Sequence, residues 1–444
     1  MNNTIAHLAF SQLNQLWQDE TRVWAINSEE KVTIAKLKQQ TAQKVQALQN
    51  TDSTRCLIYR REKMAFVSDF MACLIAQVDI VLPANGQPNT IEQARKDANA
   101  DTILADSTSM LAPESINTDI MSSTVTDVNI TVFTSGSTGK PKAITKRLSA
   151  YLLEVEMLET LWGKHFASAI VLSSVSHQHI YGFIFGILLP LTFSHIIWSE
   201  QITFEERLHY LAGQTKKCVF IASPSILVRL SETLAKSSLQ CVFSSGGVLT
   251  TEQAKKVEQH LNAPCLRIFG SSETGGIAWQ NSQSDFWTAF PNVIIGEQDG
   301  LLLLTSPYSY QSPLVVADRI RYLDSQRFFL LGRADDIVKI GEKRVALTAV
   351  EQNLEKHDCV QKAKVIVLPK PRNCLAAVLV LSPEGKKQQQ ISPRIFYQSL
   401  RQSLNRQFER ATLPKYFRCV EAFPENAQGK TLKVDLLALF SEIL

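Results

Sequence analysis

The stretch Ile130-Thr-Val-Phe-Thr-Ser-Gly-Ser-Thr-Gly-Lys-Pro-Lys142 determines how the rest of the chain is interpreted. Residues 130–133 are β-branched or aromatic, which predicts a short buried strand. The polar residues that follow this strand are Thr134, Ser135, Gly136, Ser137, Thr138, Gly139, Lys140 and Lys142. Because glycine lets backbone N–H groups approach a ligand and lysine supplies charge, this loop suits the oxygens of a polyphosphate. The alternative is a polar surface turn, but the strand in front fixes where the loop points, which favours phosphate binding.

Two common nucleotide-binding motifs are excluded at this position. An NTPase P-loop needs Gly, four residues and then Gly-Lys-Ser/Thr at the start of a helix. Here Gly139-Lys140 is followed by Pro141, and Thr134 stands where the first Gly should be. A Rossmann Gly-x-Gly-x-x-Gly pattern is also missing from the stretch.

The stretch resembles the phosphate-binding signature of the adenylate-forming superfamily, which contains acyl-CoA synthetases, luciferases and nonribosomal-peptide adenylation domains. Their pattern, Thr-Ser-Gly-Ser/Thr-Thr-Gly-x-Pro-Lys-Gly, is matched except at the last place, where Ala143 replaces Gly. The resemblance implies an α/β fold. In the expected fold, a large N-terminal domain of mixed and parallel sheets with crossover helices is followed by a small α+β C-terminal domain on a hinge. The resemblance also implies that the loop binds ATP.

Composition places the chain among globular proteins. Its 444 residues exceed one ordinary domain, and 45% are hydrophobic and 20% charged. A net charge of +4 gives no indication of nucleic-acid binding. The eight cysteines show no Cys-x-x-Cys spacing, so we expect reduced core residues rather than disulfides or zinc ligands. With no visible signal peptide, this favours a cytoplasmic protein.

The order of strand-like and helix-like segments predicts two domains. Strands are expected at 56–59, 79–83, 101–105, 167–175, 218–222, 239–243 and 265–269, and helices at 64–76, 91–98, 148–162 and 252–261. This alternation favours an α/β sheet with crossover helices. The pattern changes near residue 334, where strands at 364–368 and 375–381 precede helical spacing. We therefore expect a large ATP- and acid-binding domain over 1–333, trimmed at its N-terminal lobe relative to the family, and a small mobile domain over 334–444.

One apolar run, Ile180 to Trp198, approaches the length of a membrane span. Pro190 should interrupt a spanning helix, and the last residues of the run are typical of a strand. The sequence therefore predicts a buried helix followed by a core strand, and no transmembrane segment.

The segment Phe269-Gly-Ser-Ser-Glu-Thr-Gly-Gly276 is the second motif that carries chemistry. A carboxylate among small residues can hold a hydrated magnesium ion near phosphates. The segment resembles the family's Tyr-Gly-x-Thr-Glu motif, with Phe269 and Ser272 as conservative departures. The resemblance implies that Glu273 works with Mg²⁺ and ATP, and that Ser272 contacts the phosphate or the acyl-AMP. Phe269 and Gly270 are expected to border the substrate; the alternative is an acidic loop end.

Asp318 and Arg333, 15 residues apart, match the spacing of the family's two ribose-binding residues. A carboxylate can bind both hydroxyls of a ribose, so Asp318 and Arg333 are expected to hold that of ATP. The resemblance makes Asp335 the hinge between the domains. The family's Lys-x-x-Gly-x-Arg that follows is altered here, because Gly341 is displaced by one place and Glu342 stands in its position.

A lysine near the C-terminus completes the set of motifs. Phe423-Pro-Glu-Asn-Ala-Gln-Gly-Lys430 resembles the family's Pro-x-x-x-x-Gly-Lys. The resemblance implies that Lys430 bridges the substrate carboxylate, the ribose and the α-phosphate during adenylation, where a positive charge stabilises developing negative charge. Taken alone, Lys430 would be an ordinary surface lysine.

The acid-binding pocket is expected near a second glycine turn, Ser244-Ser-Gly-Gly-Val248, and near His179. The expected substrate-binding residues here are His179, Ser245, Gly246 and Gly247. Residues 167–199 contain no Asp or Glu, so an amino acid would bury an unpaired ammonium, which is costly. An aryl acid is favoured over a long-chain fatty acid, although these side chains also fit a packed aromatic core.

Together these motifs predict an ATP-dependent acyl or aryl acid ligase. It would form acyl-AMP and pyrophosphate, and then transfer the acyl group to a pantetheine thiol of coenzyme A or of an acyl carrier protein. One alternative is an adenylate-forming enzyme without the thioester step. Another is a nucleotide-binding regulator on the same fold, which Lys430 and Glu273 argue against.

Overall fold

A computed structural model describes residues 7–106, 121, 124–134, 142–231, 234, 238–333, 337–340, 343–369, 373–405, 408, 410–425 and 431–442. The chain forms two compact units. The first comprises residues 1–296, 303–314 and 322–329, and the second comprises 297–302, 315–321 and 330–444. The chain makes its last passage from the first unit to the second within strand β19 (Arg327–Arg333). The mixed α/β architecture confirms the predicted fold class, whereas the functional division at residue 333 stays a prediction.

One sheet of the first unit carries the phosphate-loop strand. Its order is β5-β3-β4-β6-β7, and its strands are β3 (Arg55–Tyr59), β4 (Asp79–Leu82), β5 (Thr102–Ala105), β6 (Asn129–Thr134) and β7 (Lys142–Arg147). The first four in this order pair in parallel, and β6 pairs with β7 antiparallel. Helices α3 (Lys63–Ala76) and α4 (Pro88–Asp97) make the crossover connections that parallel pairing requires.

A second sheet brings together the ends of several strands. Its order is β18-β19-β14-β13-β12-β11-β10-β8-β9-β1-β2. The strands from β12 to β1 in this order are parallel, and β13 and β14 continue antiparallel. Their bounds are β1 (Val23–Ile26), β2 (Lys31–Thr33), β8 (Ile170–Ser173), β9 (Ile196–Gln201), β10 (Cys218–Ala222), β11 (Leu239–Ser244), β12 (Cys265–Ser271), β13 (Gly275–Gln280), β14 (Trp287–Ala289) and β18 (Asp318–Tyr322).

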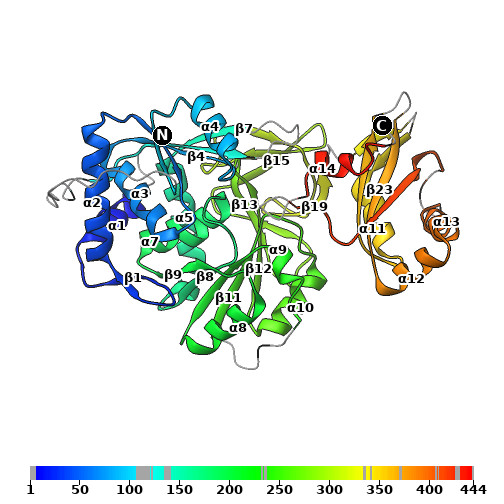
Figure 1. The fold of residues 1–444 in the computed structure, drawn as a ribbon, viewed down its shortest axis with the longest axis horizontal. Coiled ribbons are helices and arrows are strands. Elements are labelled where there is room, and N and C mark those ends of the chain that lie inside the picture. Colours follow the sequence, from blue (N-terminus) through cyan, green and yellow to red (C-terminus); the bar gives the residue numbers. More distant parts are fainter. Residues whose placement is uncertain are drawn as a thin grey trace. The chain divides into compact units, whose positions relative to one another are not determined.

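Helices cover the second sheet because each has an apolar stripe. Figure 1 shows α8 (Glu205–Gln214), α9 (Pro224–Leu227) and α10 (Thr251–Leu261) beside β11 and β12. Their buried leucines and Ile226 pack with Phe220 and Val242 of the strands. Thr250 and Gln253 form a reciprocal capping box at the start of α10. Further helices of the first unit are α1 (His7–Asn14), the 3₁₀ turn η1 (Gln15–Trp17), α2 (Ile34–Asn50) and α5 (Leu148–Phe166).

The apolar run is a buried helix followed by a strand, as predicted. It contains α6 (Ile180–Phe183), a π-helical turn η3 (Ile184–Leu188), α7 (Leu189–Phe193) and then β9. Pro190 does not end the helix, because the wider π turn precedes it and Pro190 stands at the start of α7. Among the helices that the structure describes, none is long and apolar enough to cross a membrane.

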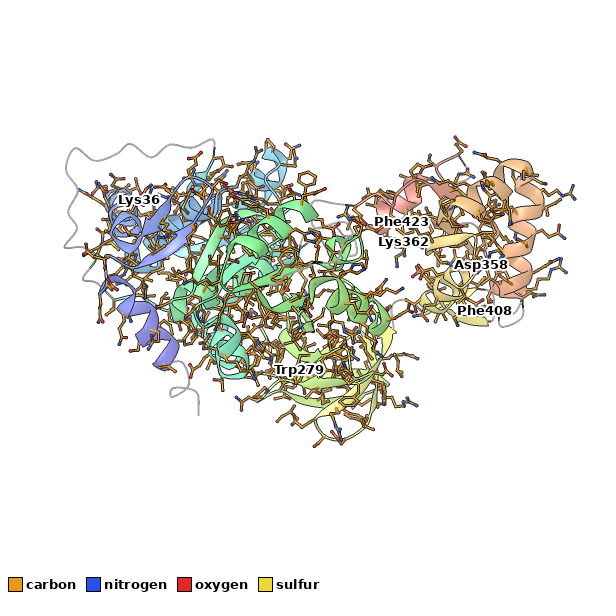
Figure 2. The ribbon with its side chains drawn as sticks, turned by 90° about the horizontal axis from the view of Figure 1, so that it is seen from below. Lys36, Trp279, Asp358, Lys362, Phe408 and Phe423 are labelled. Carbon is orange, nitrogen blue, oxygen red and sulfur yellow. The ribbon has the colours of Figure 1, made fainter. Side chains whose placement is uncertain are left out.

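The second unit has its own sheet with a core on each face. Its elements are β20 (Ile337–Ile340), β21 (Lys343–Ala346), α11 (Leu347–Glu355), β22 (Val360–Leu368), β23 (Cys374–Leu381), α12 (Pro383–Ile391), α13 (Pro393–Leu404), the 3₁₀ turn η5 (Arg410–Thr412), β24 (Tyr416–Val420) and α14 (Lys433–Ala438). Strand β23 is completely buried between β22 and β24. Alternate residues of β23 contribute to two separate apolar clusters, against which Phe408 and Phe423, labelled in Figure 2, pack.

A three-stranded sheet of β15 (Ile294–Gln298), β16 (Leu301–Thr305) and β17 (Leu314–Val316) occupies the region where helical patterning is lost. Asp299 and Gly300, at φ 53° and 77°, link the first two strands. Positive φ at both turn residues is typical of a two-residue hairpin loop.

Candidate active site

The predicted phosphate loop lies at the end of one hairpin. Strands β6 and β7 pair so that Thr134 is opposite Lys142 and Phe133 is opposite Ala143. Ile130, Val132 and Phe133 are buried, which confirms the predicted buried strand. The seven residues between Thr134 and Lys142 therefore connect two adjacent strands. These loop residues, Ser135 to Pro141, and the side chain of Thr134 lie outside the described residues.

Glu273 lies in the turn between β12 and β13. These strands pair as a hairpin in which Gly270 is opposite Gly276 and Ser271 is opposite Gly275. The hydroxyl of Thr274 accepts a hydrogen bond from the Ser271 amide at 2.9 Å and donates to the Gly275 carbonyl at 2.7 Å. A Cβ at Gly270 would lie 2.4 Å from the Gly275 carbonyl oxygen. Glycine is therefore required for the strands to come this close, and Ser272 and Glu273 occupy the tip.

Lys142 and Glu273 form an ion pair that joins the two hairpins. The Lys142 ammonium donates to the Glu273 carboxylate, and this bond raises the pKa of Lys142. The same ammonium lies 5.5 Å from the ring centroid of Tyr310. The backbone carbonyl of Glu273 accepts from the Tyr310 amide at 2.9 Å and the Ser309 hydroxyl at 3.2 Å. A partly exposed acid is thereby held beside Lys142, the residue that follows the phosphate loop in the sequence.

This arrangement fits a magnesium ion bound together with ATP. Magnesium is usually held by one or two carboxylates plus substrate phosphates, rather than by an all-protein cage. Glu273 supplies one carboxylate, 31% exposed, beside the hairpin that ends in the loop. The described residues contain no cluster of three His, Cys, Asp or Glu that could hold a metal.

The glycine turn after β11 lies next to the Glu273 hairpin. Strands β11 and β12 are parallel, with Ser244 opposite Arg267, so their carboxyl ends meet at one edge. The Ser245 hydroxyl donates to the Ile268 carbonyl at 2.9 Å. Gly246 has φ 84° and open space where a Cβ would be, whereas a Cβ at Gly247 would touch Pro224 at 3.4 Å. Ligands of α/β sheets bind outside such carboxyl ends.

Phe269 faces an aromatic group of the same unit. Its ring centroid lies 5.6 Å from that of Trp287 and 6.3 Å from that of Phe328. Packing therefore positions the Phe269 ring. Phe269 directly precedes Gly270, where strands β12 and β13 come close together.

His179 stands at the start of the buried helix, in the N-cap position of α6. Its half-buried side chain does not cap the helix. The neighbouring His177 is more deeply buried, and its Nε2 lies 2.9 Å from the Arg60 carbonyl oxygen. Burial lowers the pKa of His177 to about 3, so this imidazole is neutral at ordinary pH. His177 therefore has a structural contact, and a contact of His179 with the substrate stays a prediction.

Asp318 and Arg333 meet within the second unit. The buried Asp318 carboxylate lies 3.7 Å from Nη1 of the half-exposed Arg333 side chain. Strands β18 and β19 carry them, and Gly332, at φ 108°, directly precedes Arg333. An acidic and a basic group side by side can bind the hydroxyls of a sugar. Lys430 and the proposed hinge Asp335 lie outside the described residues.

A family model described as AMP-binding enzyme matches residues 19–293, which is more than half of the chain. The chain belongs to the AMP-binding enzyme family. The matched part of this AMP-binding enzyme contains the phosphate loop, the glycine turn and Glu273, and it ends before Asp318. The predicted membership of the adenylate-forming superfamily is thereby confirmed.

Named relatives of this AMP-binding enzyme are acid–CoA ligases. A Staphylococcus aureus (strain MRSA252) protein, named provisionally as a long chain fatty acid-CoA ligase, is 25% identical over 340 residues, covering 69% of this chain and 70% of the relative. A 4-coumarate–CoA ligase of Halorhodospira halophila is 27% identical over 237 residues, covering 53% of this chain and 59% of that enzyme. The predicted enzyme class, an AMP-forming acid–thiol ligase, agrees with these homologues.

Solved structures show the same fold. The O-succinylbenzoate coenzyme A synthetase of Bacillus subtilis, solved with AMP, has a TM-score of 0.77 at 17% identity and covers 97% of this chain and 98% of its own. That synthetase is also known with ATP and a magnesium ion. At this identity the likeness supports the fold of this AMP-binding enzyme, and the roles of its individual residues rest on the geometry above.

Sequence reasoning missed the residues that hold Glu273 in place. Tyr310 and Ser309 lie in a Ser- and Tyr-rich loop without a motif, so no local pattern indicated a role. A third missed residue is Lys146, a buried lysine of β7 whose ammonium donates to the Tyr308 carbonyl, and it could have been identified from the sequence. Period-2 alternation puts Lys142, Ile144 and Lys146 on one face of β7, and Ile144 is an apolar residue typical of a buried face.

Proposed function

We propose that this enzyme activates a carboxylic acid with ATP and transfers the acyl group to a pantetheine thiol, that of coenzyme A being favoured. The observation that carries the proposal is the ion pair between Lys142 and Glu273, which places a cation and an acid at the end of the phosphate-loop hairpin. The relatives' names support a thiol acceptor, and the choice between coenzyme A and an acyl carrier protein belongs to the proposal.

In the first half-reaction, a carboxylate oxygen of the acid attacks the α-phosphorus of ATP. The bond between the α-phosphorus and the bridging oxygen breaks, and pyrophosphate leaves with that electron pair. Ser135 to Thr138, Lys140 and Lys142 would hold the β- and γ-phosphates, with Thr134, Gly136 and Gly139 shaping the loop. Glu273 would hold a magnesium ion, which when bound neutralises phosphate charge.

The remaining residues would position the acid and the nucleoside. Asp318 and Arg333 would bind the ribose hydroxyls, and Ser272 would contact the phosphate or the acyl-AMP. Lys430 would stabilise charge on the α-phosphate and the attacking carboxylate. His179, Ser245, Gly246, Gly247, Phe269 and Gly270 would border the acid.

In the second half-reaction, the thiol sulfur attacks the acyl carbonyl carbon and loses its proton. The bond from that carbon to the AMP oxygen breaks, so AMP leaves and a thioester forms. We infer that the C-terminal part turns about Asp335 between the half-reactions, since movements of a domain often complete a catalytic site. An amino acid is disfavoured as the substrate, because residues 167–199 offer no carboxylate to pair an ammonium. An aryl acid is proposed over a long-chain fatty acid. A cytoplasmic location is proposed with it.

Acid-dependent exchange of pyrophosphate into ATP tests the first step, and thioester formation with coenzyme A or a carrier-protein pantetheine tests the second. Aryl, short aliphatic and long-chain acids should be compared in one panel. Glu273→Gln should lower the exchange rate by roughly 10²–10³. A matched control is Glu252→Gln, because Glu252 pairs with Lys256 at 2.9 Å on the exposed surface of α10. No exchange with any acid in the wild type would refute the proposed function.

A further inference from the structure

A buried polar group lies beneath the Glu273 hairpin, apart from every residue considered so far for binding. Lys146 of β7 and Glu154 of α5 are each only 4% exposed. Burying a charged side chain is costly unless it is paired and hydrogen-bonded. Apolar side chains of similar size would fill this space without that cost. Core packing alone therefore does not explain why these two buried positions carry charged side chains.

Glu154 holds the strand that leaves the Glu273 turn. Its Oε1 accepts a hydrogen bond from the Gly276 amide at 2.8 Å, across 122 residues of sequence. A Cβ at Gly275 would lie 2.8 Å from Oε2, and a Cβ at Gly276 would lie 3.2 Å from Oε1. The carboxylate thus packs directly against both glycine backbones, and burial raises its pKa.

Lys146 holds the segment that binds Glu273 from the other side. Its ammonium donates to the Tyr308 carbonyl at 3.0 Å and lies 4.3 Å from the Tyr151 ring centroid. Immediately after Tyr308, the Ser309 hydroxyl and the Tyr310 amide donate to the Glu273 carbonyl. The Tyr310 ring in turn lies beneath the ammonium of Lys142.

Strand β7 links this buried group to the phosphate loop. Lys142 and Lys146 lie four residues apart on one face of β7, and Lys142 is exposed whereas Lys146 is buried. The same strand therefore carries the cation that pairs with Glu273 and the cation that donates to the 308–310 segment.

We propose that Lys146 and Glu154 are positioning residues for adenylation, which fix Glu273 against Lys142 at the start of β7 through Gly276 and the 308–310 segment. The inference rests on the proposed function and adds the residues that set its geometry. A displacement of about 1 Å at a reacting centre can cost roughly 10²-fold in rate. We expect the effect on the constants for MgATP and not on those for the acid, because these contacts connect neither residue to the turn at Gly246 or to His179.

The test compares Lys146→Met with Lys63→Met. Lys63 is 2% exposed and donates to the Trp198 carbonyl at 3.0 Å, so it is an equally buried lysine on a carbonyl. The kinetic constants for MgATP and for the acid are measured separately by pyrophosphate exchange, the Kd of MgATP by calorimetry, and unfolding by heat. We expect both variants to lose stability, but only Lys146→Met to weaken MgATP binding and lower kcat by about 10²-fold, with KM for the acid unchanged.

Two milder variants keep the inference testable if Lys146→Met fails to fold. Ser309→Ala removes one donor to the Glu273 carbonyl outside the buried group and should weaken MgATP binding about fivefold, the effect of one hydrogen bond. Glu154→Gln keeps an acceptor for the Gly276 amide and should retain most activity. Equal MgATP constants in Lys146→Met, Lys63→Met and Ser309→Ala would overturn the inference while leaving the proposed function intact. Wild-type protein without exchange activity or MgATP binding would overturn both.

Discussion

The Lys142 ammonium donates a hydrogen bond to the Glu273 carboxylate, although 131 residues separate the two in sequence. Without nucleotide, each group therefore neutralises the charge of the other. A bound polyphosphate would pair with the Lys142 ammonium, and a bound magnesium ion would take the Glu273 carboxylate as a ligand. The pair is thus a contact that ATP and its metal would exchange for contacts of their own.

This exchange predicts opposite effects of one substitution on two forms of the nucleotide. Glu273→Gln should bind metal-free ATP more tightly than the wild type, because it removes a negative charge and releases Lys142. The same variant should bind MgATP more weakly, because the metal loses a ligand. Calorimetry with and without magnesium measures both. Glu252→Gln should change neither, and a shift of both affinities in one direction would contradict the exchange.

The phosphate loop itself gives a second prediction. Thr138→Ala and Gly139→Val should both weaken ATP binding and slow pyrophosphate exchange, because the first loses a donor and the second blocks close approach of the backbone. Thr145→Ala is a suitable control, since Thr145 bonds Thr131 at 2.8 Å on the exposed face of the same hairpin. Wild-type affinity and rate in both loop variants would place the nucleotide elsewhere.

The turn after β11 allows a matched test of acid selection. Gly246 and Gly300 both have positive φ, 84° and 77°, and both have open space where a Cβ would be. Replacing either with Leu should cost about 1–2 kcal/mol of stability from backbone strain. Only Gly246→Leu should also change the ratio of exchange rates for aryl and short aliphatic acids. Identical acid profiles in the two variants would exclude Gly246 from the pocket.

The buried Lys63 predicts how stability depends on pH. Burial lowers its pKa from 10.5 to about 8, so between these values the unfolded chain binds more protons than the folded protein. The free energy of unfolding should therefore rise with pH in this window, by up to about 1.4 kcal/mol per pH unit from this group. The neighbouring His177 stays neutral there, because its pKa is lowered to about 3.

Denaturant unfolding at pH 7, 8, 9 and 10 tests this prediction. The wild type should gain stability relative to Lys63→Met above pH 8, and the difference should be constant below it. Lys146 is present in both proteins and cancels in the comparison. Lys256→Met, at an exposed position of α10, should follow the wild type at every pH. Parallel curves for Lys63→Met and the wild type would mean that Lys63 titrates normally.

The two half-reactions should fail separately. Lys430→Ala should lose adenylation by roughly 10²–10³, yet still convert supplied acyl-AMP and thiol into thioester. Gly341→Leu, in the Lys339 to Arg344 segment that we expect to line the route of the thiol, should keep pyrophosphate exchange while thioester formation falls. Rapid-quench assays of each step measure both. Equal damage to both steps in Lys430→Ala would argue against two conformations, and the departure at Glu342 would then need explanation.

Local patterns predicted most elements because strands buried on both sides are continuous apolar runs. Cys218–Ala222 has the predicted bounds, and the phosphate strand, predicted over 130–133, is one residue longer at each end. The helix expected from Ile91 begins earlier, at Pro88, because proline is favoured in a first turn. Pro190 was expected to interrupt a helix, but the π turn before it lets the buried helix continue.

The site was harder to predict than the fold. Motifs identified Glu273 and Lys142 individually, because each stands in a recognisable pattern. Their contact, and its support from Tyr310 and Ser309, depends on strand pairings between segments far apart in the chain. Glu154 was also missed. On an amphipathic helix a glutamate is expected to face solvent, whereas the buried Glu154 accepts from the amide of Gly276 and lies near the charge of Lys146.

All eight cysteines are free, and seven of them are buried. Burial raises the thiol pKa of Cys218, Cys241 and Cys265, which keeps these groups protonated and slow to react with maleimides. A cysteine introduced at an exposed position of each unit would therefore react first in native protein, without removal of the natural ones. Two fluorophores attached in this way would report, by energy transfer, the distance between the units before and after acyl-AMP forms.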